Sequence, residues 1–109
     1  MNDDLTTFLR ARLDEDVQSQ VPRAVSRAAG PINPRYAGGP YDPVRVIREI
    51  EAKRQIIDHA EQWAQTLNYT PDGWTEATAT AYRMAMEWTL RQLALPYADH
   101  PDYRQEWRP

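Results

Sequence analysis

The chain has 109 residues and no cysteine, 41% of its residues are hydrophobic, and its formal net charge is −3. This length predicts one domain, spanning residues 1–109, around a single core. The acidic balance argues against a general nucleic-acid binder, and without cysteine there is no disulfide, thiolate catalysis or cysteine-bound zinc. The sequence has no apolar run of membrane-spanning length and no signal-peptide pattern, so we expect a cytoplasmic protein with no membrane role.

A first helix is predicted over residues 3–20, where apolar residues recur every three or four positions. Asn2 or Asp3 can cap its start, and the buried stripe consists of Leu5, Phe8, Leu9 and Leu13. Pro22 lacks the backbone donor that a continuing helix uses, so we expect the helix to end or kink near Gln20. There is room for one further turn over residues 24–29.

A loop is predicted over residues 30–42, where the sequence becomes rich in glycine and proline. Ile32, Tyr36 and Tyr41 give it enough apolar surface to pack on the helices. An ordered wrapping segment and a mobile recognition loop both fit this composition.

A second helix is predicted over residues 43–67. Asp42 followed by Pro43 combines an N-cap acceptor with the residue preferred at the first helical position. Arg45 and Glu49 mark its solvated side. The apolar face contains Val46, Ile47, Ile50, Ile57, Ala60, Ala64 and Leu67, with Trp63 beside it.

A third helix is predicted from Asp72 or Thr75 to Leu95, over residues 72–95 at its longest, preceded by Thr70 and Pro71 as a cap and first-turn pair. It has two apolar faces. One contains Trp74, Ala77, Ala81, Met84, Trp88 and Leu95, and the other contains Tyr82, Met86, Leu90 and Leu93. A helix that is apolar on two sides needs two covering partners. We therefore expect the other helices on one side and the tail, or another subunit, on the other.

The tail, residues 96–109, is rich in rings and stiffened by Pro96 and Pro101. Such a segment is predicted to dock, because its rings would otherwise form an exposed apolar patch. The fold prediction is an all-α, compact three-helix bundle with the tail folded over the third helix.

Three blocks of sequence resemble a family of small, uncharacterised actinobacterial proteins, which also occurs on phages and mobile elements of those hosts. The blocks are DDLTTFLRARLDED, YDPVRVIREIEAKRQIID and LRQLALPYADHPDYRQEWRP. The resemblance implies a shared fold and a similar host range, but no activity. The chain departs from the pattern between Ile32 and Tyr41, where longer relatives have a fuller insert, and between His59 and Trp88, where many have cysteines.

His59 and His100 are the candidates for a metal site or a general base, because carboxylates flank each of them. Asp58 and Glu61 share a helix face that His59 does not. Asp99-His100-Pro101-Asp102 is more typical of a turn in which an Asp side chain accepts backbone donors. We therefore favour structural roles and expect no catalytic residue, no metal and no cofactor.

The other signatures of catalysis or nucleic-acid binding are weak. Ser19 and Ser26 lack the tight turn that exposes a nucleophile, and Gly38-Gly39 lacks the Lys-Ser or Lys-Thr of a phosphate loop. Arg23, Arg27 and Arg35 form a locally positive stretch before the second helix. Along that helix, acids dilute Arg45, Arg48, Lys53 and Arg54, which favours a solvated face over a DNA site.

The functional hypothesis is a non-catalytic protein-interaction or regulatory module with an unidentified protein partner and a possible homodimer through the third helix. The candidate interaction surface is Trp88, Tyr97, His100, Tyr103, Arg104, Trp107 and Arg108. The same rings can instead form a core and its lid. Two alternatives stay open: a small DNA-binding regulator that reads with the helix after Asp42 or Thr70, and a metal-dependent enzyme that uses His59 and His100.

Overall fold

The structure, a computed structural model, describes residues 3–28, 42–66 and 70–109. It consists of α1 (Asp3–Ala28), α2 (Pro43–Thr66), α3 (Glu76–Ala94) and the short 3₁₀ helices η2 (Leu95–Tyr97) and η3 (Gln105–Trp107). These parts of the chain contain no strand, which confirms the all-α prediction. None of their helices is both long and apolar enough to cross a bilayer. The predicted loop, except Asp42, and the predicted helix end at Leu67 lie outside the described residues.

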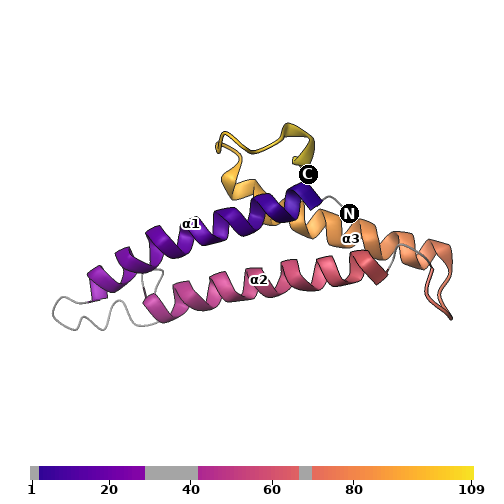
Figure 1. Ribbon diagram of the computed structural model, residues 1–109, viewed down its shortest axis with the longest axis horizontal. Helices are drawn as coiled ribbons and strands as arrows, with labels where there is room; N and C mark the ends of the chain where they lie inside the picture. The colour runs from indigo at the N-terminus through magenta and orange to yellow at the C-terminus, as the bar shows by residue number, and fades with distance from the viewer. Residues whose placement is uncertain (1–2, 29–41, 67–69) are drawn as a thin grey trace.

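The helices form a long, flat bundle and not the compact one expected. Its extents are 58 × 32 × 18 Å. α1 and α2 run antiparallel and side by side, and α3 packs on the end where α1 begins and α2 ends (Figure 1). The opposite end of the α1–α2 pair extends beyond α3 (Figure 1). A thin bundle of this kind leaves one side of α3 without a covering helix.

α1 is longer than predicted, because it continues through Pro22 to Ala28. Pro22 is exposed, whereas Ala24 is buried in the same core cluster as Val46 and Ile50 of α2. The free energy gained by packing against α2 therefore offsets the loss of the backbone hydrogen bond that proline cannot make. The prediction of an end near Gln20 is wrong, because local propensity was weighed without this tertiary contact.

The start of α2 is as predicted, and α3 begins directly after Thr75, the later of its two predicted starts. The Asp42 carboxylate accepts the backbone N–H of Val44 at 2.9 Å. α3 begins at Glu76, where the Thr75 hydroxyl accepts the N–H of Thr78 at 3.1 Å. The Thr70-Pro71 pair is therefore not its cap. Residues 71–74 form a turn in which Gly73 has a φ of +82°, a conformation that favours glycine.

Trp74 lies in this turn and not on the third helix, as had been predicted. Its ring stacks on Trp63 of α2 at 5.6 Å between centroids and meets Tyr82 of α3 edge-on at 5.6 Å. The ring centroids of Trp63 and Tyr82 are 5.2 Å apart. The three rings join the end of α2 to the start of α3.

The tail docks, as predicted, but it packs on α1 and not over α3. Phe8 of α1 meets four tail rings, with centroid distances between 5.1 and 6.3 Å, from Tyr97, His100, Tyr103 and Trp107. Trp107 is only 2% exposed. The tail therefore completes the hydrophobic core on the α1 side of the bundle.

The core lies where α1, α2, α3 and the tail meet. Its fully buried large side chains include Leu5, Leu9, Leu13, Ile57 and Leu90. Ile47, which was predicted to face the core, is exposed near the start of α2. The α2 periodicity therefore predicted most of the buried face, but not how far the covering elements reach.

Replacing Trp107 by alanine is expected to lower the free energy of unfolding by about 3–5 kcal/mol, because it removes a buried ring and leaves a cavity against Phe8. Chemical denaturation measures the loss. Glu106→Ala, a neighbouring exposed position, is the control and is expected to change stability by less than about 0.5 kcal/mol. Equal losses in the two variants would show that the tail is not part of the core.

Candidate functional site

The seven residues of the predicted interaction surface do not form one surface. Tyr103 and Trp107 are buried and belong to the core. Tyr97 and His100 are half-buried against α1, while Arg104 and Arg108 are exposed. Arg104 binds Asp4 at 2.9 Å and lies 5.5 Å from the Trp107 ring. The core-and-lid interpretation therefore describes the tail rings, and Trp88 lies apart from them on α3.

His100 is held by the tail turn and by α1. Its Nδ1 accepts the backbone N–H of Asp102 at 3.0 Å. Arg12 Nη1 lies 2.6 Å from Nε2 and 2.7 Å from Nδ1 of the same ring. The turn was predicted with an Asp side chain as its acceptor, whereas the acceptor observed here is the imidazole. These contacts give His100 a structural role in fastening the tail.

Arg12 is a buried cation that the sequence reading missed. Its side chain is 8% exposed, its guanidinium carbon lies 5.0 Å from the centroid of the Phe8 ring, and it binds Glu15 at 3.0 Å. The Asp102 carboxylate lies 3.7 Å from Nη1 of Arg12. Position 12 lies directly before Leu13, on the edge of the buried stripe of the first helix. This position was the feature of the sequence that could have predicted its burial.

Replacing Arg12 by alanine is expected to cost about 2–3 kcal/mol of stability, because the tail loses a buried, charge-assisted contact. Arg10→Ala is the matched control. Arg10 binds both Asp58 and Glu61 at 2.7 and 2.6 Å, but its side chain is 38% exposed. Its removal is expected to cost about 1 kcal/mol or less. Thermal and chemical denaturation of both variants measure the difference, and a larger loss for Arg10→Ala would contradict it.

Tyr97 fastens the same part of the tail to α1 through a hydrogen bond that its hydroxyl donates to Asp16. Burial, followed by this hydrogen bond, raises the pKa of the Tyr97 hydroxyl above its ordinary value. The folded chain therefore keeps the hydroxyl proton at a pH where the unfolded chain has lost it. The stabilisation is complete below the ordinary tyrosine pKa of about 10 and is lost as the pH rises above it.

Tyr97→Phe tests this linkage. We expect the wild type to be more stable than the variant at pH 8, because the variant lacks the hydrogen bond to Asp16. The difference should shrink as the pH rises above about 10. Denaturation curves at several pH values provide the measurement, and a constant difference up to pH 12 would contradict the assignment.

His59 lies on α2, apart from the contacts of His100. Its side chain is exposed, and its ring lies 6.1 Å from Trp63. Asp58 and Glu61 share a face, as predicted, and both bind Arg10 of α1. The hydrogen bonds that Arg10 donates, first to Glu61 and then to Asp58, raise the pKa of Arg10. Within residues 3–28, 42–66 and 70–109, no three His, Asp or Glu residues are placed to hold a metal ion.

An apolar groove lies between α2 and α3. Its volume is about 740 Å³, and its apolar walls come from Ile56 and Ala60 of α2 and from Tyr82, Ala85 and Met86 of α3. Ile56 and Tyr82 remain substantially exposed there. Thus the side of α3 that faces α2 is only partly covered.

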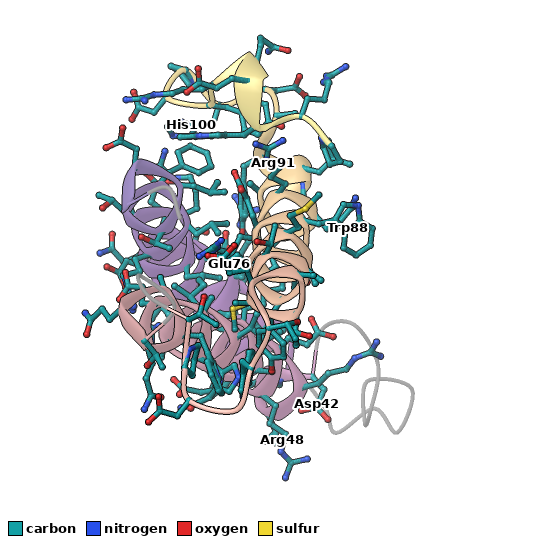
Figure 2. All side chains as sticks on the ribbon, turned by 90° about the vertical axis from the view of Figure 1, so that its right-hand side faces the viewer. Asp42, Arg48, Glu76, Trp88, Arg91 and His100 are labelled. Atoms are coloured by element: carbon teal, nitrogen blue, oxygen red, sulfur yellow. The ribbon has the colours of Figure 1, made fainter. Side chains whose placement is uncertain are left out.

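The outer face of α3 adjoins this groove and consists of Ala77, Ala81, Met84 and Trp88; Leu95, which was predicted to belong to the third helix, begins η2. The spacing of four, three and four from Ala77 to Trp88 places these residues on one side of the helix. Met84 is 66% and Trp88 is 60% exposed. Figure 2 shows the Trp88 side chain projecting from α3 away from α1 and α2. This second apolar side of α3 was predicted from the sequence, but the tail predicted as one possible cover packs elsewhere.

Most charged residues of α3 lie on another side of the helix, next to the outer face. Glu76, Arg83, Glu87 and Arg91 follow each other at intervals of seven, four and four positions, which places them along another side of the helix. Arg91 binds Glu87 at 2.9 Å. The outer face is therefore apolar from Ala77 to Trp88, and Arg91 borders it one turn after Trp88.

Residues 2–109 match a family of unknown function, DUF6221. The chain belongs to this family. The search of curated proteins and the search of solved structures found no match. The family match covers the helices, the tail and the outer face of α3, and it assigns no activity to any of them.

Proposed function

We propose that this chain is a non-catalytic protein-interaction module, and that its contact surface is the outer face of α3 together with the adjoining groove. The observation that carries the proposal is the exposure of Trp88 and Met84 on the apolar outer face of α3. Large exposed apolar patches mark interaction sites, and tryptophan is enriched among the residues that dominate binding energy.

Other exposed apolar side chains support the proposal less. Val17 and Val25 lie in the second half of α1, and Val44 and Ile47 lie near the start of α2. They are aliphatic, and single exposed aliphatic residues are normal on protein surfaces. The outer face of α3 differs because it combines a tryptophan, a methionine and a groove.

The contacts of the charged residues favour this role over the two alternatives. On α2, Arg45 pairs with Glu49, and Arg54 pairs with Glu51 and with Asp14 of α1. Such pairing reduces the positive charge offered to a phosphate backbone. The contacts of His100 fasten the tail and favour a structural role over a catalytic one.

The biological setting follows from the sequence resemblance. We propose that the module acts in the cytoplasm of actinobacteria, or is encoded by their phages or mobile elements, in an interaction or regulatory role. The three sequence blocks that carry the resemblance lie in α1, in α2 and its preceding residues, and in the end of α3 with the tail.

Met84→Glu combined with Trp88→Glu is expected to abolish partner binding without unfolding the chain, because both side chains are more than half exposed. Affinity capture with the purified full chain as bait, in a lysate of the source organism, compares the bound proteins by mass spectrometry. Val25→Glu is the matched control, because it places the same charge at a half-exposed apolar position away from α3. Circular dichroism checks that all variants are helical.

The expected result is that the wild type and Val25→Glu retain the same protein and the double variant retains neither that protein nor a second copy of this chain. Retention of the same proteins by all three baits would overturn the proposed surface. If both the double variant and Val25→Glu lose the bound protein, added charge alone disturbs binding. This result would also count against the proposed surface.

A further inference from the structure

A pocket with a volume of about 500 Å³ lies between α1 and the tail. Phe8 of α1 and Pro101 of the tail give it apolar walls. Arg12, Tyr103 and Trp107 also line it. We propose that this pocket binds a carboxylate that carries an apolar group, either a free organic acid or the carboxyl end of a peptide. The site is separate from the outer face of α3.

Three residues of the pocket each have a buried polar atom that makes no hydrogen bond. These atoms are Nε of Arg12, the hydroxyl oxygen of Tyr103 and Nε1 of Trp107, and the three residues are 6%, 8% and 2% exposed. In the described part of the chain, one further buried side-chain atom lacks a partner, Nε of Arg91, which does not line this pocket. Buried polar groups are nearly always paired, because an unpaired one costs free energy. Three unpaired groups in one pocket therefore indicate a ligand.

The chemistry of the three groups selects a ligand that accepts hydrogen bonds. The N–H groups of Arg12 and Trp107 can only donate, and the Tyr103 hydroxyl can donate as well. A carboxylate has about four acceptor positions on its two oxygens, which is enough for all three donors. Phe8 and the other apolar walls offer surface to the rest of the ligand.

The charges around the pocket favour an anion. The side chain of Arg12 is only 8% exposed, and its ion pair with Glu15 uses Nη2 and leaves Nε without a partner. The side chains of Asp4 and Asp102, which also line the pocket, are 61% and 74% exposed. Water and salt therefore screen these carboxylates more than they screen the buried guanidinium. Hydrogen bonds between arginine and a carboxylate are also stronger than neutral ones.

The ligand reaches the buried donors when the tail turn, residues 101–104, moves outward. Arg104 of this turn pairs with Asp4 of α1, but both side chains are more than half exposed, and such pairs contribute little to stability. The firmer contacts of the tail with α1, from Tyr97 and His100, precede the turn. Opening the turn costs free energy, so we expect weak binding of a small probe, with a dissociation constant of about 1 mM.

Proton–nitrogen correlation NMR of the purified full chain tests the site, with sodium phenylacetate as the probe. The expected result is a saturable shift of the assigned indole N–H signal of Trp107 and no shift of that of Trp88. Phenylacetamide has the same ring without the charge and should bind at least about fivefold more weakly. No saturable shift at Trp107 up to about 50 mM phenylacetate, or equal binding of the two probes, would overturn the proposal.

Two matched variants separate binding from stability. Tyr103→Phe removes a hydroxyl that has no partner in the chain, so it should leave stability unchanged and weaken phenylacetate binding about fivefold. Tyr97→Phe removes a hydroxyl that already bonds Asp16, outside the pocket, so it should lower stability and leave binding unchanged. Wild-type affinity in Tyr103→Phe, or an equal loss of affinity in both variants, would overturn the proposal.

Acetyl-glycyl-phenylalanine, with either a free or an amidated carboxyl end, distinguishes the two sources of the carboxylate. Tighter binding of the free acid than of phenylacetate assigns the ligand to the end of a protein chain, and weaker binding assigns it to an organic acid. Both results support the site. If the acid and the amide bind equally well, the carboxylate is not recognised and the proposal is overturned.

This site and the outer face of α3 can fail separately. Met84→Glu combined with Trp88→Glu should bind phenylacetate with the affinity of the wild type, because neither residue lines the pocket. A loss of phenylacetate binding in this double variant would place the probe on α3 and overturn the proposal.

Discussion

The contact between Phe8 and the tail rings is the interaction on which the bundle depends. α3 covers only one end of the α1–α2 pair, and the apolar side of α1 needs a further cover that is not a helix (Figure 1). Tyr97, His100, Tyr103 and Trp107 supply that cover. Arg12 and Asp16 of α1 then hold the tail in place through His100 and Tyr97. Apolar burial and polar contacts thus act together where the tail packs on α1.

This arrangement also explains why α3 has a free side. The tail continues from α3 through η2, but it turns onto α1 and leaves Met84 and Trp88 exposed. A chain of this size with a thin bundle has more apolar surface than its own elements can cover. Part of this excess lies on the outer face of α3, where Met84 and Trp88 are the most exposed large apolar side chains of the described residues.

The sequence was sufficient to predict the helical class, the start of α2 and most of the buried faces, because these follow from local capping and from periodicity within one helix. It was insufficient where two distant segments decide the outcome. Pro22 stays inside α1 because Ala24 packs in the core with Val46 and Ile50, and no local rule contains that contact. The direction in which the tail folds, and the burial of Arg12, have the same origin. For the candidate site, the sequence predicted a second apolar side on α3, but only the fold shows which ring-bearing residues lie in the core and which face outward.

The contact between the start of α1 and the tail has a consequence for the rate of folding. Asp4 and Arg104, which form an ion pair across it, are 100 positions apart. The helices depend on neighbours in sequence and can form rapidly, whereas joining segments this distant requires closing a loop that contains nearly every residue. Refolding should therefore be slower than for a helical bundle of equal size with only local contacts, and its slow phase should report the arrival of Trp107 beside Phe8.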